Sequence, residues 1–536
     1  MALRNARPVS FVPKGLTDAY DSTQAFSGSC RLLQNLVFDQ GNPELLQARP
    51  GVVSLTTFPG FTTPTFVTVF IVINGVVYGM VSTARTAGFD EPFAYNVAAN
   101  TFTTITGVTA GNVPSSPSTS GAWTPPTMAV IGTKIIVTHP GFSGSGSNFF
   151  GIIDISTPSA PTWTASNLAT NALPSVPTAV ANFNNRAWYV CNNVVYYSDV
   201  LVPATRTNAS QSVTVGDPSS VIAMSGLPVQ TTSAGVVQAL IVFKSFSVWQ
   251  ITGDTATSNL ALNFLSLNIG TTAARSVVQT PFGTNFMAAD GPYIVDALGT
   301  VKPLTKTPQE LTQDIQLPFI NSQQPTRTSA AYFGGIYRIC VDTYLNSSAS
   351  TNDYWFDIER RRWNGPHTWP HDCCGAVNNY FVISHRTKGA VLYQSQFTSS
   401  LSAVYTDAGT AITCIMQSSS LPKDANMNEK YVLESTIELS TAGASASYQI
   451  QALDDQLNVL NNTLIMTTGA GYTWGGHLWG SGKWSSSINI PHVYTIAWSS
   501  PLVFQKMSIQ VNVTSSINIS IGEFRARYQD LGYVNQ

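Results

Sequence analysis

The chain has 536 residues, of which only 10% are charged, well below the roughly 25% that is usual for soluble proteins. Its formal net charge of -2 excludes a general electrostatic attraction to nucleic acid. A surface kept soluble by hydroxyl and amide groups, with little net charge, is typical of a protein held in a large assembly.

The N-terminus and the cysteines bear on where the chain folds. Its 6 cysteines are scattered and do not form a disulfide framework. Residues 1–14 lack the apolar core of a signal peptide. The longest apolar run, residues 66–80, is interrupted by the turn sequence Asn74-Gly75, which predicts two strands and no membrane span. We therefore expect folding in a reducing cytoplasm with free thiols.

Residues 1–60 differ from the rest because they carry basic residues and two proline turns. The basic residues are Arg4, Arg7, Lys14, Arg31 and Arg49. This pattern predicts an extended segment that lies along a partner surface. The alternative is an ordinary first strand followed by a loop.

A hairpin pattern recurs further along the chain. The segment Asp353–Trp363 reads as a strand of aromatic and β-branched residues, a polar turn and a second strand that opens on tryptophan. Phe93–Phe102 matches its register, and Ile152–Trp163 is a looser third copy with a longer turn. A strand ended by Asp or Asn and closed by an aromatic side chain is typical of a propeller blade. The alternative is three unrelated hairpins in an irregular all-β protein.

Residues 61–400 contain six groups of short strands, which predict a β-propeller of about six irregular blades with loop insertions. Only Pro308–Gln316 has a helical pattern, and two Gly-rich or Ser-rich loops cover 107–126 and 141–148. The six groups span residues 66–105, 128–163, 179–197, 239–254, 285–300 and 329–394.

Residues 401–536 have longer alternating strands, such as Ile517–Arg527, which predict an antiparallel sandwich with one solvated face. The loop Trp474–Trp484 places aromatics on a Gly-rich backbone, and we expect it to contact a neighbouring subunit, with a sugar contact as the alternative. These patterns predict an all-β fold class, a propeller followed by a separate sandwich domain.

A possible metal site lies at His367, His371, Cys373 and Cys374, whose residue types could hold zinc. Adjacent cysteines are awkward ligands for one tetrahedral ion, and the surrounding tryptophans and prolines indicate an ordered surface loop. We therefore predict no metal and no cofactor, and keep these four residues only as weak metal candidates.

The other residues that could be catalytic do not match a known catalytic spacing or motif. Asp353 and Asp357 lie about 13 Å apart along one strand, too far for the paired carboxylates of a glycosidase. The segment Gly141–Gly146 matches neither the nucleophile elbow nor a phosphate-binding loop. The sequence thus offers no catalytic residue, and we predict that the chain is not an enzyme.

Three blocks of sequence resemble the tail nozzle proteins of short-tailed bacteriophages, a family also called tail tubular protein B or packaged-DNA stabilisation proteins. The first block lies near the N-terminus, the second in the middle and the third at the C-terminus, in the family's order. They are Cys30–Asn35 with Arg49–Gly51; Gly226–Pro228 with Gln238–Lys244 and Val248–Asp254; and Leu502–Ile509 with Ala526–Tyr533.

The resemblance implies a β-propeller beside a platform built from both chain ends. It also implies a virion protein of the phage tail, assembled in the host cytoplasm as a hexamer. Such a ring would dock on the adaptor below the portal, extend the DNA channel and close it until ejection. DNA would pass without sequence-specific binding, and fibres, a spike or a needle would attach outside or at the tip.

Two sets of residues are candidates within that role. Glycine-rich segments can change conformation at little steric cost, so the channel-gate candidates are Gly141, Phe142, Ser143 and Gly144. The candidates for adaptor docking are Arg31, Arg49, Arg525 and Arg527.

Two other functions stay open. A carbohydrate-binding or depolymerising tail protein would share the all-β composition but would bind or hydrolyse glycans. A non-viral propeller scaffold would form a stable soluble monomer with no phage partner.

Overall fold

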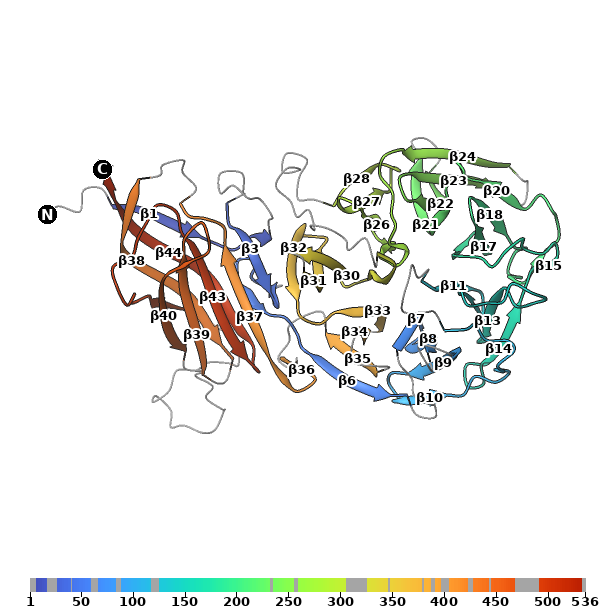
Figure 1. Ribbon diagram of the computed structural model, residues 1–536, viewed down its shortest axis with the longest axis horizontal. Helices are drawn as coiled ribbons and strands as arrows, with labels where there is room; N and C mark the ends of the chain where they lie inside the picture. The colour runs from blue at the N-terminus through green and yellow to red at the C-terminus, as the bar shows by residue number, and fades with distance from the viewer. Residues whose placement is uncertain are drawn as a thin grey trace.

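The structure is a computed structural model in which two parts lie side by side, a ring of small sheets and a platform of two larger ones (Figure 1). Apart from two short 3-10 turns, η1 (Ala274–Ser276) and η3 (Pro325–Arg327), the described regular structure is all strand. The predicted helix at Pro308–Gln316 and the loop Trp474–Trp484 lie outside the described residues. The described residues are 6–16, 27–39, 41–58, 66–82, 88–116, 125–231, 235–254, 259–304, 325–345, 348–377, 380–386, 391–396, 404–422, 428–442, 445–467 and 491–532.

Five separate four-stranded antiparallel sheets make most of the ring, which confirms the predicted β-propeller. A short parallel pair, β15 (Ala169–Thr170) with β19 (Thr205–Arg206), flanks the third sheet. The strands of the five sheets are β7 (Phe66–Ile73), β8 (Val76–Ser82), β9 (Asp90–Asn96) and β10 (Thr101–Thr103); β11 (Thr127–Ile131), β12 (Lys134–Thr138), β13 (Phe150–Asp154) and β14 (Thr162–Ser166); β16 (Val180–Phe183), β17 (Arg186–Cys191), β18 (Val194–Tyr197) and β20 (Ser212–Thr214); β21 (Val221–Thr231), β22 (Gly235–Lys244), β23 (Val248–Asp254) and β24 (Asn259–Ser266); and β25 (Val278–Thr280), β26 (Gly283–Ala288), β27 (Gly291–Asp296) and β28 (Val301–Pro303).

The predicted sixth group, 329–394, divides into two units that complete the ring. Its first unit is a four-stranded meander and its second has three strands of its own. The fourth strand of the second unit is β6 (Val52–Thr57), which pairs antiparallel with β35. An N-terminal strand therefore closes the propeller. The units are β29 (Ser329–Phe333), β30 (Ile336–Leu345), β31 (Ser348–Asp357) and β32 (Arg362–His367), then β33 (His371–Val377), β34 (Tyr380–His385) and β35 (Val391–Gln396).

The recurring hairpin has the predicted geometry. Phe356 pairs with Trp363 across β31 and β32 with ring centroids 4.8 Å apart, and Tyr95 pairs with Phe102 at 5.0 Å. In the third copy Trp163 lies opposite Ile153 and is buried between the first two blades. The aromatic residue thus closes each hairpin and packs into the core.

The polar residue that ends each of these strands stabilises the following turn. Asp357 Oδ1 accepts the backbone N–H of Arg360 at 3.0 Å, and Asn96 Oδ1 accepts that of Ala99 at 2.9 Å. Asn74-Gly75 has positive φ at both positions, +49° and +79°, as a two-residue hairpin turn requires. These local signals explain why most blade strands can be read from the sequence.

The platform consists of two mainly antiparallel sheets, which confirms the predicted sandwich. Its core contains Ile437 and Phe524 from one sheet and Met416, Ile450 and Val511 from the other. The first sheet has the order β4 (Leu36–Phe38), β5 (Leu46–Ala48), β44 (Ile519–Gly532), β38 (Glu429–Thr441) and β41 (His492–Thr495), with β1 (Ala6–Phe11) on β44 and β42 (Val503–Phe504) on β38. The second contains β2 (Gly15–Leu16), β3 (Ser29–Gln34), β37 (Thr410–Ser418), β43 (Ser508–Ser515), β39 (Ala446–Leu453) and β40 (Val459–Thr467).

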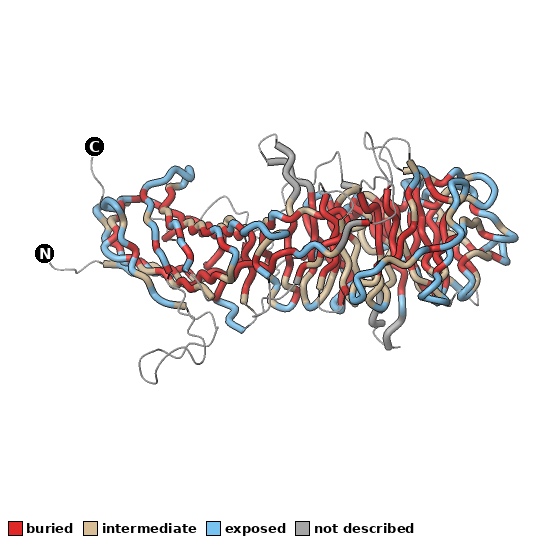
Figure 2. The backbone as a smooth tube through the Cα atoms, turned by 90° about the horizontal axis from the view of Figure 1, so that it is seen from below, coloured by how far each residue is buried: buried red, intermediate tan, exposed pale blue. Residues whose placement is uncertain are grey.

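The first and last described strands lie in the platform, where β1 runs antiparallel to β44 from Ala6 opposite Gln529 to Phe11 opposite Phe524. The second platform sheet also continues into the propeller. β3 pairs with β32 at Leu33 and Gly365, and β36 (Thr406–Asp407) pairs with β6. Figure 2 shows buried residues running through both the propeller and the platform. The described residues of the predicted docking segment, 1–60, are divided between platform strands and the closing strand of the propeller.

Candidate functional site: the axial cavity of the propeller

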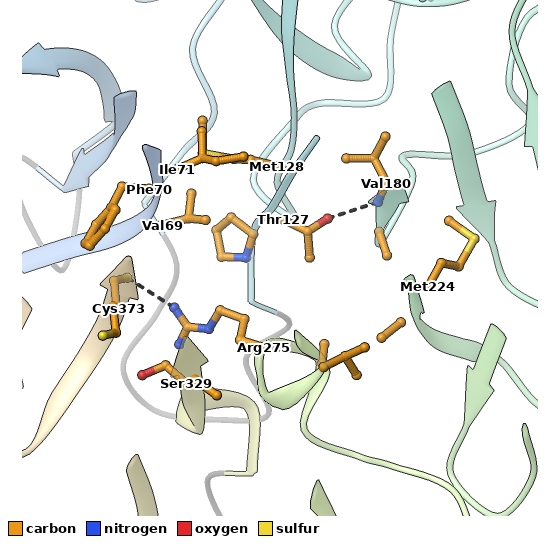
Figure 3. Close-up of a pocket in the computed structure, with 17 residues that line it drawn as sticks. Val69, Phe70, Ile71, Thr127, Met128, Val180, Met224, Arg275, Ser329 and Cys373 are labelled. Atoms are coloured by element: carbon orange, nitrogen blue, oxygen red, sulfur yellow. Dashed lines mark hydrogen bonds between the residues drawn. The ribbon is translucent and has the colours of Figure 1, made fainter. Parts of the chain in front are cut away.

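A cavity of about 230 Å³ lies where the inner segments of the blades meet (Figure 3). Strands β7, β11, β16, β21, β29 and β33 and the turn η1 line it. The axis of a propeller is where several blades can contribute side chains to one ligand, so this cavity is the candidate site.

The cavity wall combines apolar side chains with polar groups. Val69, Phe70, Met128, Val180 and Met224 contribute aliphatic, aromatic and thioether groups from four different strands. Some of the polar groups in the wall are occupied within the chain. Thr127 Oγ1, for example, accepts the backbone N–H of Val180 at 3.0 Å (Figure 3). A ligand would therefore meet polar as well as apolar surface.

Arg275 is the charged residue among the described residues that line the cavity. Its Nη1 donates to Thr68 O at 2.8 Å and to Cys373 Sγ at 3.4 Å, and its Nη2 donates to Thr326 O at 3.2 Å. Burial lowers the pKa of this guanidinium, although arginine stays protonated in proteins. Arg275 thus brings a positive charge to the wall and links three segments of the ring.

A second ionic group lies behind this wall. Asp372 Oδ1 accepts from Arg386 Nε at 2.8 Å and from Arg327 Nε at 3.1 Å. Burial would raise the pKa of Asp372, but Arg386 and Arg327 hold it below its usual value. Burial raises the pKa of the neighbouring Cys373 thiol to about 11, so the thiol is neutral at pH 7. The negative charge here is therefore that of Asp372, which is hydrogen-bonded by Arg386 and Arg327 and also attracts Arg275.

A buried hydrogen-bond network runs from the cavity wall into the four-stranded unit β29–β32. Ser329 Oγ lies 2.8 Å from His371 Nδ1, and His371 Nε2 lies 3.5 Å from Asp353 Oδ1. Arg338 Nη2 pairs with Asp353 Oδ2 at 2.7 Å, and Trp355 Nε1 donates to the same oxygen at 3.0 Å. Burial would raise the pKa of Asp353, but the Arg338 charge holds it well below its usual range. The Asp353 carboxylate is therefore engaged inside the chain.

The four metal candidates have different surroundings. His371 contacts Ser329 and Asp353, Cys373 faces Arg275 and Val67 O, and burial lowers the pKa of His367 to about 3. Burial raises the pKa of Cys374. Within the described part of the chain, no three His, Cys, Asp or Glu side chains form a metal-binding group. All six cysteines are free thiols.

The gate candidates lie in an ordered loop between β12 and β13. Phe142 is buried and stacks on Trp163 with ring centroids 6.4 Å apart. Gly141 N–H donates to His139 Nδ1 at 2.9 Å, and a Cβ on Gly141 would lie only 2.0 Å from Ser115 O. Gly144 has φ +68°. The first half of the loop is therefore fixed by packing, and Ser143 is exposed beyond it.

The candidates for adaptor docking differ in how exposed their side chains are. Arg525 and Arg527 are exposed on the same face of β44, opposite Thr436 and Glu434 of β38. Arg31 is half-buried on β3. Arg49 has an exposed fraction of only 1% and pairs with Asp407, so its guanidinium is used within the chain. Arg525 pairs with Glu523 but is 59% exposed, so Arg525 and Arg527 are the exposed candidates that a partner could contact.

Sequence reasoning missed Arg275 and Ser329 as residues of the cavity wall. Both lie in short connecting or strand segments without a recognisable motif. Their position depends on how the blades are arranged around the axis, which no local pattern encodes.

Comparison with known proteins leaves the family open. No protein-family model matches the chain, and no curated protein resembles it in sequence. One solved structure that is similar to this chain is the exo-β-1,3-galactanase from Phanerochaete chrysosporium with β-1,3-galactotriose. The match covers 90% of this chain and 99% of the galactanase chain, at 9% sequence identity and a TM-score of 0.28. This match to an enzyme contradicts the prediction that the chain is not one, and that prediction is withdrawn. At this TM-score the match carries no argument for a particular activity.

Among the described residues, no helix is both long and apolar enough to cross a membrane.

Proposed function

We propose that this chain is a structural subunit of the tail nozzle of a short-tailed bacteriophage. The observation that carries the proposal is the platform, in which β1 and β44, the first and last described strands, pair side by side next to a propeller. The resemblance of the three sequence blocks implies this arrangement of a propeller beside a platform built from both ends.

The continuity between the two parts supports the same role. One 15-stranded sheet includes strands of both the propeller and the platform, so a force on one part is transmitted through backbone hydrogen bonds to the other. A nozzle subunit needs such stiffness because it is held between an adaptor and a receptor-engaging tip. The low charged fraction, 10%, suits a subunit locked into an assembly.

The platform face around Arg525 and Arg527 is the surface that we assign to the adaptor. These exposed guanidinium groups alternate with buried Phe524, Ala526 and Tyr528 along β44, so they can contact a partner without disturbing the platform core. In the proposed hexamer, the exposed end of the 141–148 loop is the part that can reach the channel, because Phe142 anchors the other end.

Gold-labelled antibody against this chain, viewed on intact phage particles by electron microscopy, tests the proposal. A ring of label at the lower end of a short tail stub is the expected result. Label on distal fibres would assign the chain to receptor recognition instead, and binding to a glycan array would then be the next measurement. Absence of label from every particle would overturn the virion role.

A further inference from the structure

We propose that His139 is a proton-operated latch, which holds the loop 141–148 against the connector 107–116 and releases it in acid. The connector is the described part of the loop 107–126. The latch goes beyond the proposed role in a phage tail, because it lies within a single chain and needs no assembly. It rests on how the two nitrogens of one buried imidazole are used.

The first step is the hydrogen bonding of the His139 ring, which is fully buried. Its Nδ1 accepts the backbone N–H of Gly141 at 2.9 Å, so Nδ1 carries no proton. Its Nε2 therefore carries the ring proton and donates to Asp90 Oδ2 at 2.8 Å. The closed loop thus requires the neutral imidazole in one defined tautomer.

The second step is that these bonds join three segments of the chain. Asp90 begins β9, and its Oδ1 accepts from Ser116 Oγ of the connector at 2.6 Å. Ser115 N–H donates to Gly141 O at 3.0 Å. The peptide groups of Gly141 are therefore held on one side by the imidazole, which directly follows β12, and on the other by the connector.

The third step is the effect of a proton. Protonation adds an N–H at Nδ1, which then faces the N–H of Gly141, and two donors cannot form a hydrogen bond with each other. The imidazolium keeps its bond to Asp90 and gains the attraction of the opposite charge. The contact that yields is therefore the one to Gly141, at the start of the loop.

The charges around the imidazole leave this contact to a single titration. Asp90 is the ionisable group that contacts the ring in the described part of the chain. The next residue, Glu91, points to the opposite face of β9, and Lys134 lies at the far end of β12. The segments 107–116 and 140–148 contain no Asp, Glu, His, Lys, Arg, Cys or Tyr.

Proton linkage gives the direction of the response. The closed loop binds one proton fewer than the open loop, so acid favours the open loop. The closed loop is therefore most populated above roughly pH 6.5, where imidazole is ordinarily neutral. Below that pH the ratio of closed to open loop is expected to fall by up to about tenfold per pH unit.

Hydrogen exchange of the full chain, followed by NMR, is the first measurement. Protection is expressed relative to the unfolded chain, so that the intrinsic pH dependence of exchange cancels. The Gly141 amide is expected to lose protection by up to about tenfold per pH unit below roughly pH 6.5. The control is the Leu201 amide, which donates at 2.8 Å to Asn185 O, a backbone carbonyl that does not titrate.

Two substitutions separate the roles of the two ring nitrogens. In His139→Asn, an amide oxygen can accept the Gly141 N–H in place of Nδ1 without titrating, so Gly141 is expected to stay protected in acid. In His139→Gln, an amide N–H can donate to Asp90 in place of Nε2, but Gly141 loses its acceptor. Gly141 is then expected to be poorly protected at every pH.

Three results would overturn the proposal. The first is a constant ratio of Gly141 to Leu201 protection in the wild type as the pH falls. The second is the same pH dependence in the wild type and in His139→Asn. The third is a parallel loss of protection at Ile135 and Ile153, which pair in the same blade and would report unfolding of that blade. The first and third need only the wild type, so they hold even where a variant does not fold.

Discussion

At the scale of single residues, the buried ion pair between Arg338 and Asp353 is expected to contribute strongly to the stability of the four-stranded unit β29–β32. Both side chains have exposed fractions of 1% or less. Asp353→Asn leaves the guanidinium buried without its counter-charge, which costs about 3–5 kcal/mol of unfolding free energy. Chemical denaturation measures this loss. Lys302→Gln is the control, because the Lys302 side chain is 54% exposed in its pair with Asp296, and such surface pairs are worth about 0–1 kcal/mol. An equal loss in both variants would refute the argument.

A second residue-scale prediction concerns acid. Burial lowers the pKa of His367 from 6.5 to about 3, so below pH 6.5 the unfolded chain binds a proton that the folded chain does not. Its contribution to stability is therefore complete above pH 6.5 and is lost at about 1.4 kcal/mol per pH unit as the pH falls toward 3.

His367→Leu removes that proton-binding difference. We expect the variant's unfolding free energy to fall less steeply than the wild type's between pH 6.5 and 4, as measured by denaturant titrations at several pH values. At pH 7 the histidine is neutral in both states, so a difference there reports packing alone. Parallel pH profiles for the two proteins would contradict the prediction.

At the scale of elements, β6 tests whether the N-terminal strand closes the ring. Val52 is 1% exposed and packs with Phe381, Ile383 and Tyr393, whereas Val53 on the opposite face of the strand is 45% exposed. Val52→Asp is expected to cost more than about 2 kcal/mol, because an isolated carboxylate would be buried. Hydrogen exchange should then increase in β35, its pairing partner. Val53→Asp should leave that exchange unchanged, and similar exchange in both variants would show that β6 is dispensable.

The same element shows how far sequence reasoning reached. Hairpins of the first two blades were predictable because Asn74-Gly75 and the recurring pattern, an Asp or Asn followed by an aromatic residue, act within a few residues. The pairing of Val52 with Ser395 joins segments far apart in the chain, and no local pattern selects that partner. This is why the group at 329–394 was read as one unit. Arg275 was not predicted from the sequence for the same reason, because the segments that it links come from separate blades.

At the scale of the whole molecule, one buried junction joins propeller and platform. Arg49 Nε donates to Asn35 Oδ1 at 2.9 Å and Nη1 donates to Asp407 Oδ1 at 2.9 Å. Asn35 Nδ2 in turn donates to Thr368 Oγ1, after the propeller strand β32, and to Thr413 O, on the platform strand β37. The side chain predicted from the sequence to dock on a partner therefore holds the two parts of its own chain together.

Substitution of Arg49 by methionine distinguishes these two roles. In the isolated chain, Arg49→Met leaves Asp407 and Asn35 without their main donor and is expected to cost about 3–5 kcal/mol, so that propeller and platform unfold in separate calorimetric transitions. Arg525→Met, on the exposed face of β44, should change stability by no more than about 0.5 kcal/mol. If Arg49 acts only in docking, the order reverses: the isolated Arg49→Met chain would melt like the wild type, and a defect would appear only in assembled particles.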